Sequence, residues 1–170
     1  METKKMFARL CLASALLLLP AAAQAQEPNA CDKFKWSVAR EKSWFEAAPQ
    51  KVASGDAAQV GKGYAVALKP LAETAFAKTP ARAPKPETFA ALLTVPAIDK
   101  PGLYDITLSG EGWIDAVQNG AIARTVDFSG LVGCAAVRKS VRYQLESGPL
   151  TVQISNVAGE SVLLAIAPVE

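Results

Sequence analysis

None of the 170 residues is histidine, and this absence excludes several kinds of active site. The chain cannot build a histidine-activated serine or cysteine nucleophile, nor a histidine-ligated zinc, copper or iron centre. Acid–base chemistry or calcium binding would fall to carboxylates near the predicted strands. They are Asp99, Asp105, Glu111, Asp115 and Asp127. They form no Asp-x-Asp-x-Asp ladder, and no Gly-rich phosphate loop precedes a helix. We therefore expect no metal, no cofactor and no catalytic residue.

The best candidate for a binding site surrounds one tryptophan. Trp113 and Asp115 are two positions apart on one predicted strand and therefore share a face. On another predicted strand, Lys139 shares a face with Val137 and Val141. If both charges face the core, they must be compensated, because an isolated buried charge is prohibitive. Asp115 and Lys139 then meet each other, or each reaches a cleft beside Trp113.

A second arrangement leaves both charges in water. It requires that Ile114 and Ala116 form the inward face, or that a β-bulge between Gly133 and Arg138 shifts the alternation. Bulges are common beside glycine-rich loops. The sequence is compatible with either arrangement.

Two arginines extend this candidate site. They lie on the predicted strand that carries Lys139, on its opposite face. Arg138 and Arg142 are four residues apart with Ser140 between them, so they form a small basic stripe. Next to Trp113 the stripe suits an anionic or sugar ligand, since shallow sites combine an aromatic surface with a few polar groups. The alternative is a solvated strand edge whose charges prevent pairing with other chains.

These candidates lie in a run of short segments in which apolar residues alternate. The segments are 103–109, 113–118, 121–128, 137–145, 150–155 and 161–167. Alternation is typical of strands with one buried face, and Asn119-Gly120 predicts a tight hairpin. Segment 161–167 is apolar on both faces, so we expect it to be central or covered on both sides. The pattern predicts an antiparallel all-β sandwich, jelly-roll-like, built on a β-meander.

The residues before this run add further elements. We expect an edge strand at 34–36, a helix at 38–48 that caps one open end of the sandwich, and strands at 64–68, 74–77 and 88–95. We expect a polar connection at 50–63. Residues 79–88 contain three prolines within positions 80–87, which exclude a helix or a central strand and predict an extended surface crossover.

The N-terminus predicts export. Lys4, Lys5 and Arg9 precede an apolar run that Pro20 ends, and 23–25 is a small-x-small cleavage site. Residues 1–25 are therefore predicted to be a signal peptide, and 26–170 a single β-sandwich domain in the periplasm or outside the cell. The apolar run is too short for a membrane anchor.

Cleavage would leave two cysteines and a balanced charge. In an oxidising compartment Cys31 and Cys134 are expected to form a disulfide. Cleavage removes three of 18 basic residues and one of 16 acidic residues, which leaves 15 of each. No basic excess remains to attract nucleic acid or an anionic membrane, so neither is an expected partner.

Several motifs resemble a family of small exported proteins of alphaproteobacteria. They are 112–115 (GWID), 133–134 (GC), 137–143 (VRKSVRY), 34–36 (FKW) and 38–41 (VARE). Members of that family are sometimes labelled homogentisate 1,2-dioxygenase, an enzyme whose iron is held by histidines and a glutamate. A chain without histidine does not support that label. The general plan is also similar to the accessory sandwich domains of secreted enzymes and to carbohydrate-binding modules.

We therefore expect a non-catalytic exported sandwich that binds a ligand, such as a glycan, or an envelope partner. The predicted ligand-binding residues are Trp113, Asp115, Arg138, Lys139 and Arg142. Two other classes stay open. One is an enzyme that uses paired carboxylates, and the other is a structural or assembly factor of the envelope.

Overall fold

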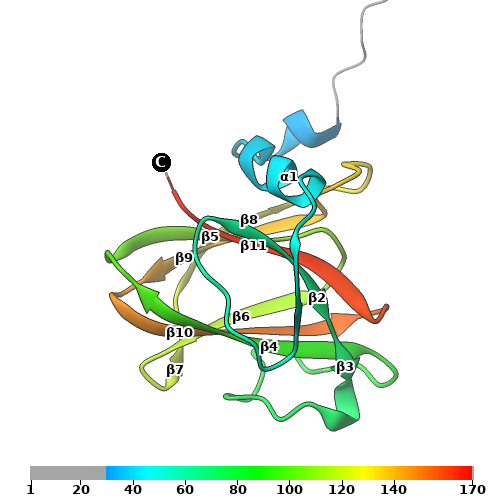
Figure 1. Cartoon of the computed structure of the whole chain (residues 1–170), viewed down its shortest axis with the longest axis vertical. Coiled ribbons are helices and arrows are strands. Elements are labelled where there is room, and N and C mark those ends of the chain that lie inside the picture. Colours follow the sequence, from blue (N-terminus) through cyan, green and yellow to red (C-terminus); the bar gives the residue numbers. More distant parts are fainter. Residues whose placement is uncertain (1–29, 170) are drawn as a thin grey trace, which may run out of the picture.

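The computed structural model describes residues 30–169, so the predicted signal peptide lies outside the described residues. Within that range two sheets pack face to face (Figure 1). The six-stranded sheet comprises, in spatial order, β1 (Gln50–Ala53), β2 (Lys62–Ala67), β11 (Ser161–Pro168), β5 (Gly102–Leu108), β9 (Lys139–Leu145) and β8 (Thr125–Gly130). The five-stranded sheet comprises β3 (Lys69–Pro70), β4 (Phe89–Ile98), β10 (Gly148–Val157), β6 (Trp113–Gln118) and β7 (Ala121–Ile122). The predicted all-β sandwich is confirmed.

One hydrophobic core lies between the sheets, and it follows the predicted alternation. Ile106 and Leu108 of β5 face Val152 and Ile154 of β10, and all four side chains are fully buried. Every strand pair is antiparallel except β1 with β2. Burial of large aliphatic side chains contributes about 1.5–3 kcal/mol each, so this layer is the main source of stability.

The connections differ from a meander, because successive strands change sheet. β5 and β6 are consecutive in sequence but lie in different sheets. The predicted strand 121–128 divides into β7 and β8, which also lie in different sheets. The hairpin prediction is confirmed: Asn119 and Gly120 both have positive φ (53° and 73°), and Gln118 pairs with Ala121.

The helix α1 (Ala39–Glu46) forms where a helix was predicted but has a different role. It does not cap an open end; it lies on the outer face of the six-stranded sheet, against β2 and β11 (Figure 1). A side chain at Gly63 of β2 would come within 3.0 Å of Trp44, so glycine permits this close packing. Phe45 and Ala165 belong to a second buried cluster there. The strand 161–167 is thus central and covered on both faces, as predicted.

Three other predictions from the N-terminal half are wrong. Residues 34–36 form no strand; they follow the 3-10 helix η1 (Ala30–Lys33), and Phe34 packs into the second cluster instead. The polar connection 50–63 contains β1, whose single buried residue, Val52, gave no periodic signal. Residues 74–77 form no strand and follow the 3-10 helix η2 (Leu71–Glu73).

The predicted disulfide is present. It joins Cys31 in η1 to Cys134 in the loop between β8 and β9, 103 residues further along the chain. Both cysteines belong to the second cluster, together with Val137. The bridge therefore attaches the start of the described chain to the sheet that it covers.

Candidate ligand-binding site

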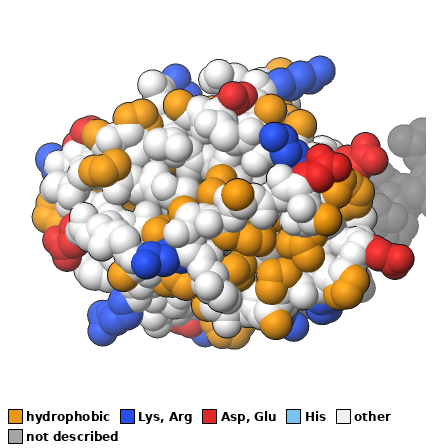
Figure 2. Space-filling model, turned by 90° about the horizontal axis from the view of Figure 1, so that it is seen from below, with side chains coloured by type: hydrophobic (Ala, Val, Ile, Leu, Met, Phe, Trp, Pro, Cys, Tyr) orange, Lys and Arg blue, Asp and Glu red, His pale blue; other side chains and the backbone are white. Residues whose placement is uncertain are grey.

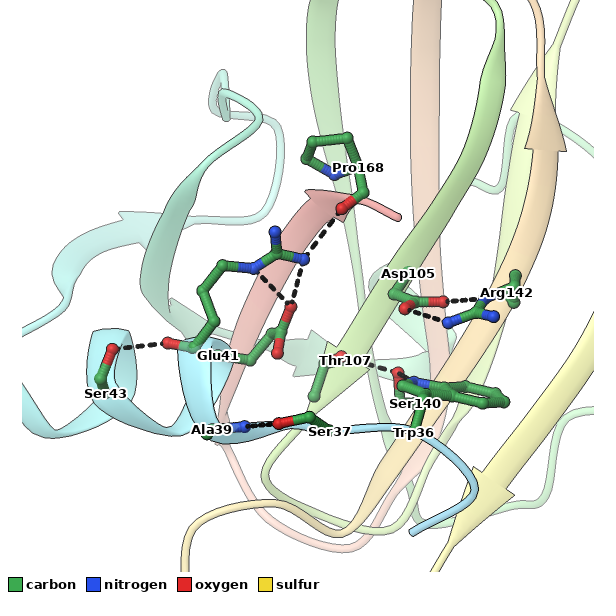
Figure 3. Close-up of polar contacts among 11 residues, drawn as sticks. Trp36, Ser37, Ala39, Glu41, Ser43, Asp105, Thr107, Ser140, Arg142 and Pro168 are labelled. Atoms are coloured by element: carbon green, nitrogen blue, oxygen red, sulfur yellow. Dashed lines mark hydrogen bonds and ion pairs between the residues drawn. The ribbon is translucent and has the colours of Figure 1, made fainter. Parts of the chain in front are cut away.

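The structure separates Arg142 from the other predicted site residues. Arg142 lies on the outer face of the six-stranded sheet, where its Nε and Nη2 donate to the two carboxylate oxygens of Asp105, each at 2.8 Å (Figure 3). The guanidinium carbon lies 4.2 Å from the ring centroid of Trp36. The hydrogen bonds to Asp105 raise the pKa of Arg142. Such two-point contacts hold both side chains in fixed orientations.

Two hydroxyl groups complete what we call the Arg142 cluster: Arg142, Asp105, Trp36, Ser140 and Thr107. Trp36 Nε1 donates to Ser140 Oγ at 3.2 Å, and Thr107 Oγ1 lies 2.9 Å from the same atom (Figure 3). Beside it, Arg40 donates to Glu41 and to the carbonyl of Pro168. A hollow of about 210 Å³ lies between these groups. The charged groups of the cluster are engaged by one another. Because Trp36 contacts Ser140 and Arg142 of β9, the cluster attaches the N-terminal segment to the sheet.

Asp115 lies on the outer face of the five-stranded sheet. Ile114 and Ala116 point into the core, which is the second of the two predicted arrangements, yet Asp115 is only 2% exposed. Its Oδ1 accepts from Trp113 Nε1 at 2.9 Å, and its Oδ2 accepts from the backbone N–H of Ala81 at 3.2 Å. It is therefore neither in water nor paired with Lys139.

The element that covers Asp115 is the segment 74–88, here the crossover. It has no helix or strand and runs from η2 to β4. Figure 2 views the molecule from this side. Hydrophobic side chains, which in this colouring include alanine and proline, gather near the centre of the face, and charged side chains are scattered around them. The crossover covers the outer face of the five-stranded sheet, so polar residues on that face, such as Asp115, are buried.

Lys139 faces inward, as its alternation with Val141 predicted, but it lies at the end of the sandwich. Its Nζ donates to the carbonyl of Gly112 at 3.2 Å and lies 4.7 Å from the ring centroid of Trp113. A side chain at Gly112 would come within 2.9 Å of Val157, so glycine lets the turn approach β10 and present this carbonyl. Lys139 thus reaches Trp113 from the opposite sheet.

Two arginines complete what we call the Trp113 cluster: Trp113, Asp115, Lys139, Arg82, Arg138 and Glu111. The guanidinium carbon of Arg82 lies 5.6 Å from the Trp113 ring centroid. Arg138 pairs with the exposed Glu111 at 3.3 Å. Four of the five predicted binding residues are thus together, without Arg142.

Electrostatics distinguishes Lys139 from an ordinary surface lysine. Partial burial is the main cause that lowers its pKa, and repulsion by Arg82 lowers it further. Among residues 30–169, neither Lys139 nor Arg82 forms an ion pair. Both of Asp115's oxygens are already engaged. The site therefore has a local excess of positive charge.

Three other candidate carboxylates are each paired with a basic side chain. Asp105, Glu111 and Asp127 bind Arg142, Arg138 and Lys35 respectively. No group of three or more metal-ligating side chains occurs between residues 30 and 169. No helix in that range is long and apolar enough to cross a membrane.

No pattern in the sequence points to Arg82. It lies in a proline-rich segment without periodicity, and only the tertiary fold places it beside Trp113. Gln153 and Asn156, which bind the crossover backbone, were likewise not singled out. Comparison of the chain with family models, curated proteins and solved structures finds no match. Function must therefore be inferred from the geometry of the Trp113 cluster.

Proposed function

We propose that the protein is a non-catalytic, exported binding protein whose ligand is an acidic saccharide held at the Trp113 cluster. One observation carries the proposal. Lys139 and Arg82 both lie over the indole of Trp113, and neither has a carboxylate partner among the described residues. An anionic group of a ligand would supply that partner.

Physical reasons favour an anion here. Partial burial of an ammonium is unfavourable, and the lowered pKa of Lys139 reflects that cost and the repulsion from Arg82. A carboxylate bound between the two cations would offset both effects. Asp115 holds the indole in one orientation through Nε1, so little ordering remains to be done when a ligand binds.

An acidic saccharide has two groups that the Trp113 cluster can bind. Its ring can pack against an aromatic side chain, and an acidic substituent can meet the cations. Trp113 is only partly buried, so some of its surface is accessible. The Arg142 cluster is a poorer candidate, because Asp105 already satisfies its arginine.

The fold and compartment agree with this proposal. The orders β2-β11-β5-β9 and β4-β10-β6-β7 correspond to the two sheets of a jelly roll, an architecture that occurs among lectin domains. This supports the proposed jelly-roll-like arrangement, although fold alone does not fix function. The predicted signal peptide and the Cys31–Cys134 disulfide support a periplasmic or secreted location.

A second candidate function rests on a different surface. Val126 and Phe128 of the edge strand β8, and Val132 beyond it, are large hydrophobic side chains that are 42%, 61% and 84% exposed. Exposed apolar patches favour protein partners. However, the Asp127 carboxylate accepts the N–H of Phe128 at 2.7 Å, so a partner strand would have to displace it. The exposed residues support an envelope assembly factor as the second candidate, and the Asp127 contact makes it the weaker of the two.

Titration of the ¹⁵N-labelled mature protein with D-galacturonate, followed by NMR, tests the proposal. At about 0.3 kcal/mol per non-hydrogen atom, a monosaccharide of about 13 such atoms should bind with a Kd of about 1 mM. The Trp113 indole N–H, assigned with Trp113→Phe, should shift, and neutral D-galactose should leave it unchanged. Arg82→Ala and Lys139→Met should each weaken binding.

Arg124→Ala is the matched control. The Arg124 carbonyl binds the N–H of Gln144, near the far end of β9 from Lys139. The five residue steps from 139 to 144 span about 17 Å, so this arginine is remote from Trp113. Equal weakening by the control, or no indole shift with galacturonate, would contradict the proposal.

A further inference from the structure

The crossover is fastened to the five-stranded sheet by side chains rather than by strand pairing. Gln153 accepts from the N–H of Lys78 at 2.8 Å and donates to its carbonyl at 3.1 Å. Asn156 accepts from the N–H of Lys85 at 2.6 Å and donates to the carbonyl of Ala83 at 3.4 Å. Together with the bond from Ala81 to Asp115, these contacts hold the crossover at three points.

The positions of these three points give the crossover a direction. Asp115 and Gln153 are direct neighbours across β6 and β10. Asn156 lies three residues further along β10, just beyond Ser155, which pairs with Trp113. The crossover therefore proceeds from the middle of the sheet towards the end where the Trp113 cluster lies.

Between its first and last attachment points, residues 78–85, the crossover carries only positively charged side chains, and its one acidic residue, Glu87, follows them. Lys78, Arg82 and Lys85 are exposed, and no acidic residue occurs between Thr74 and Pro86. None of the ion pairs formed within residues 30–169 includes any of the three. Because the backbone N–H groups of Lys78 and Lys85 are bound to the sheet, their side chains start from fixed positions.

We propose that the crossover is an extended subsite, and that the ligand is a linear acidic oligosaccharide rather than a single sugar. The inference rests on the proposed function, because Arg82 belongs to both sites. One acidic unit lies at Trp113 between Arg82 and Lys139, and further acidic units follow the crossover to Lys78 and Lys85. Gln153 and Asn156, which bind the backbone of Lys78 and Lys85, are three residues apart on β10. At about 3.3 Å per residue this is about 10 Å, which is longer than one sugar.

The alternative is a solvated basic loop whose charges only keep the protein soluble. The two readings differ in the length dependence of binding. A row of fixed cations gains affinity with each acidic unit that it contacts, whereas a solvated loop gives only the statistical gain of a repetitive ligand. Prolines within the crossover reduce the ordering required on binding, which favours the first reading.

The experiment compares galacturonate with its linear oligomers from two to eight units, using calorimetry on the disulfide-bonded mature protein. Two added contacts, each about two- to fivefold as for exposed charge pairs, should make the hexamer bind about tenfold more tightly than its six units explain statistically. Lys78→Ala/Lys85→Ala should remove most of this gain. Lys51→Ala/Lys62→Ala, two exposed lysines of the other sheet, should retain it. Unchanged melting temperatures verify that each variant is folded.

The outcomes separate the two proposals. Binding of galacturonate at Trp113 without a gain for the hexamer, or a full gain in Lys78→Ala/Lys85→Ala, overturns the extended subsite and leaves the proposed function intact. Absence of binding by monomer and hexamer alike overturns both. Equally tight binding of a linear polyphosphate of matched charge, without a shift of the Trp113 indole, overturns the assignment to saccharides.

Discussion

Replacing Arg142 by methionine tests whether the Arg142 cluster is structural. Methionine keeps an unbranched apolar stem beside Trp36 but removes the guanidinium that holds Asp105. Asp105 is 4% exposed, so its carboxylate would lose both charge-assisted hydrogen bonds while remaining away from water. Loss of one partner from a buried ion pair is far more costly than loss of both.

The expected magnitude follows from that burial. Breaking a buried pair from one side costs about 3–5 kcal/mol, and the side chain of Arg142, 19% exposed, is nearly as sheltered as that of Asp105. For a domain of this size 1 kcal/mol corresponds to about 3–4 °C in melting temperature. Arg142→Met should therefore lower Tm by about 10–20 °C.

Urea denaturation followed by tryptophan fluorescence measures the effect, and a double-mutant cycle isolates its cause. Asp105→Leu/Arg142→Met removes both charges and should be more stable than Arg142→Met alone. A loss below about 1 kcal/mol for Arg142→Met, or a double variant as unstable as the sum of the singles, would refute the reasoning.

Three further predictions address the other elements. Lys139 has a folded pKa below the usual 10.5, so its ammonium destabilises the fold below the folded pKa, and this cost disappears as the pH rises to 10.5. Lys139→Met should therefore be at least as stable as the wild type at pH 7, with a difference that vanishes above pH 10.5; a clear loss of stability at pH 7 would count against this. Cys31→Ala/Cys134→Ala opens a loop of 103 residues and should cost about 4–5 kcal/mol in the chain-entropy model, measured by urea denaturation against the oxidised protein. Gln153→Ala removes two hydrogen bonds to Lys78, and trypsin should then cleave after Lys78 or Arg82 faster than in the wild type, whereas equal rates would mean that the crossover is held by other contacts.

The strand pattern was predictable wherever apolar residues occupy one face of a strand and polar residues occupy the other. Alternation identified the inward residues of β5 and β10, and Asn119-Gly120 identified the turn between β6 and β7. The double-faced apolar pattern of β11 correctly indicated a covered strand. In these segments the apolar residues that alternation selects are the ones that form the core, so the pattern is sufficient to place them.

The prediction failed where tertiary contacts decide. Val52 is the single buried residue of β1, so this parallel edge strand had no periodic signal. Trp113 and Val117 are as apolar as Ile114 and Ala116, and alternation could not decide which pair faces the core. Both faces of β6 are in fact buried, one by the opposite sheet and the other by the crossover.

The crossover also explains why polar residues are buried outside the core. A proline-rich segment has few free N–H groups and cannot pair as a central strand, so its backbone must find other partners. Asp115, Gln153 and Asn156 supply them from the outer face of the sheet. Since Asp115 also binds the indole of Trp113, the same contacts that attach the crossover set the position of Arg82 relative to that ring. Weakening the attachment should therefore impair binding even where no ligand-contacting residue is changed, which links the stability of this face to the proposed site.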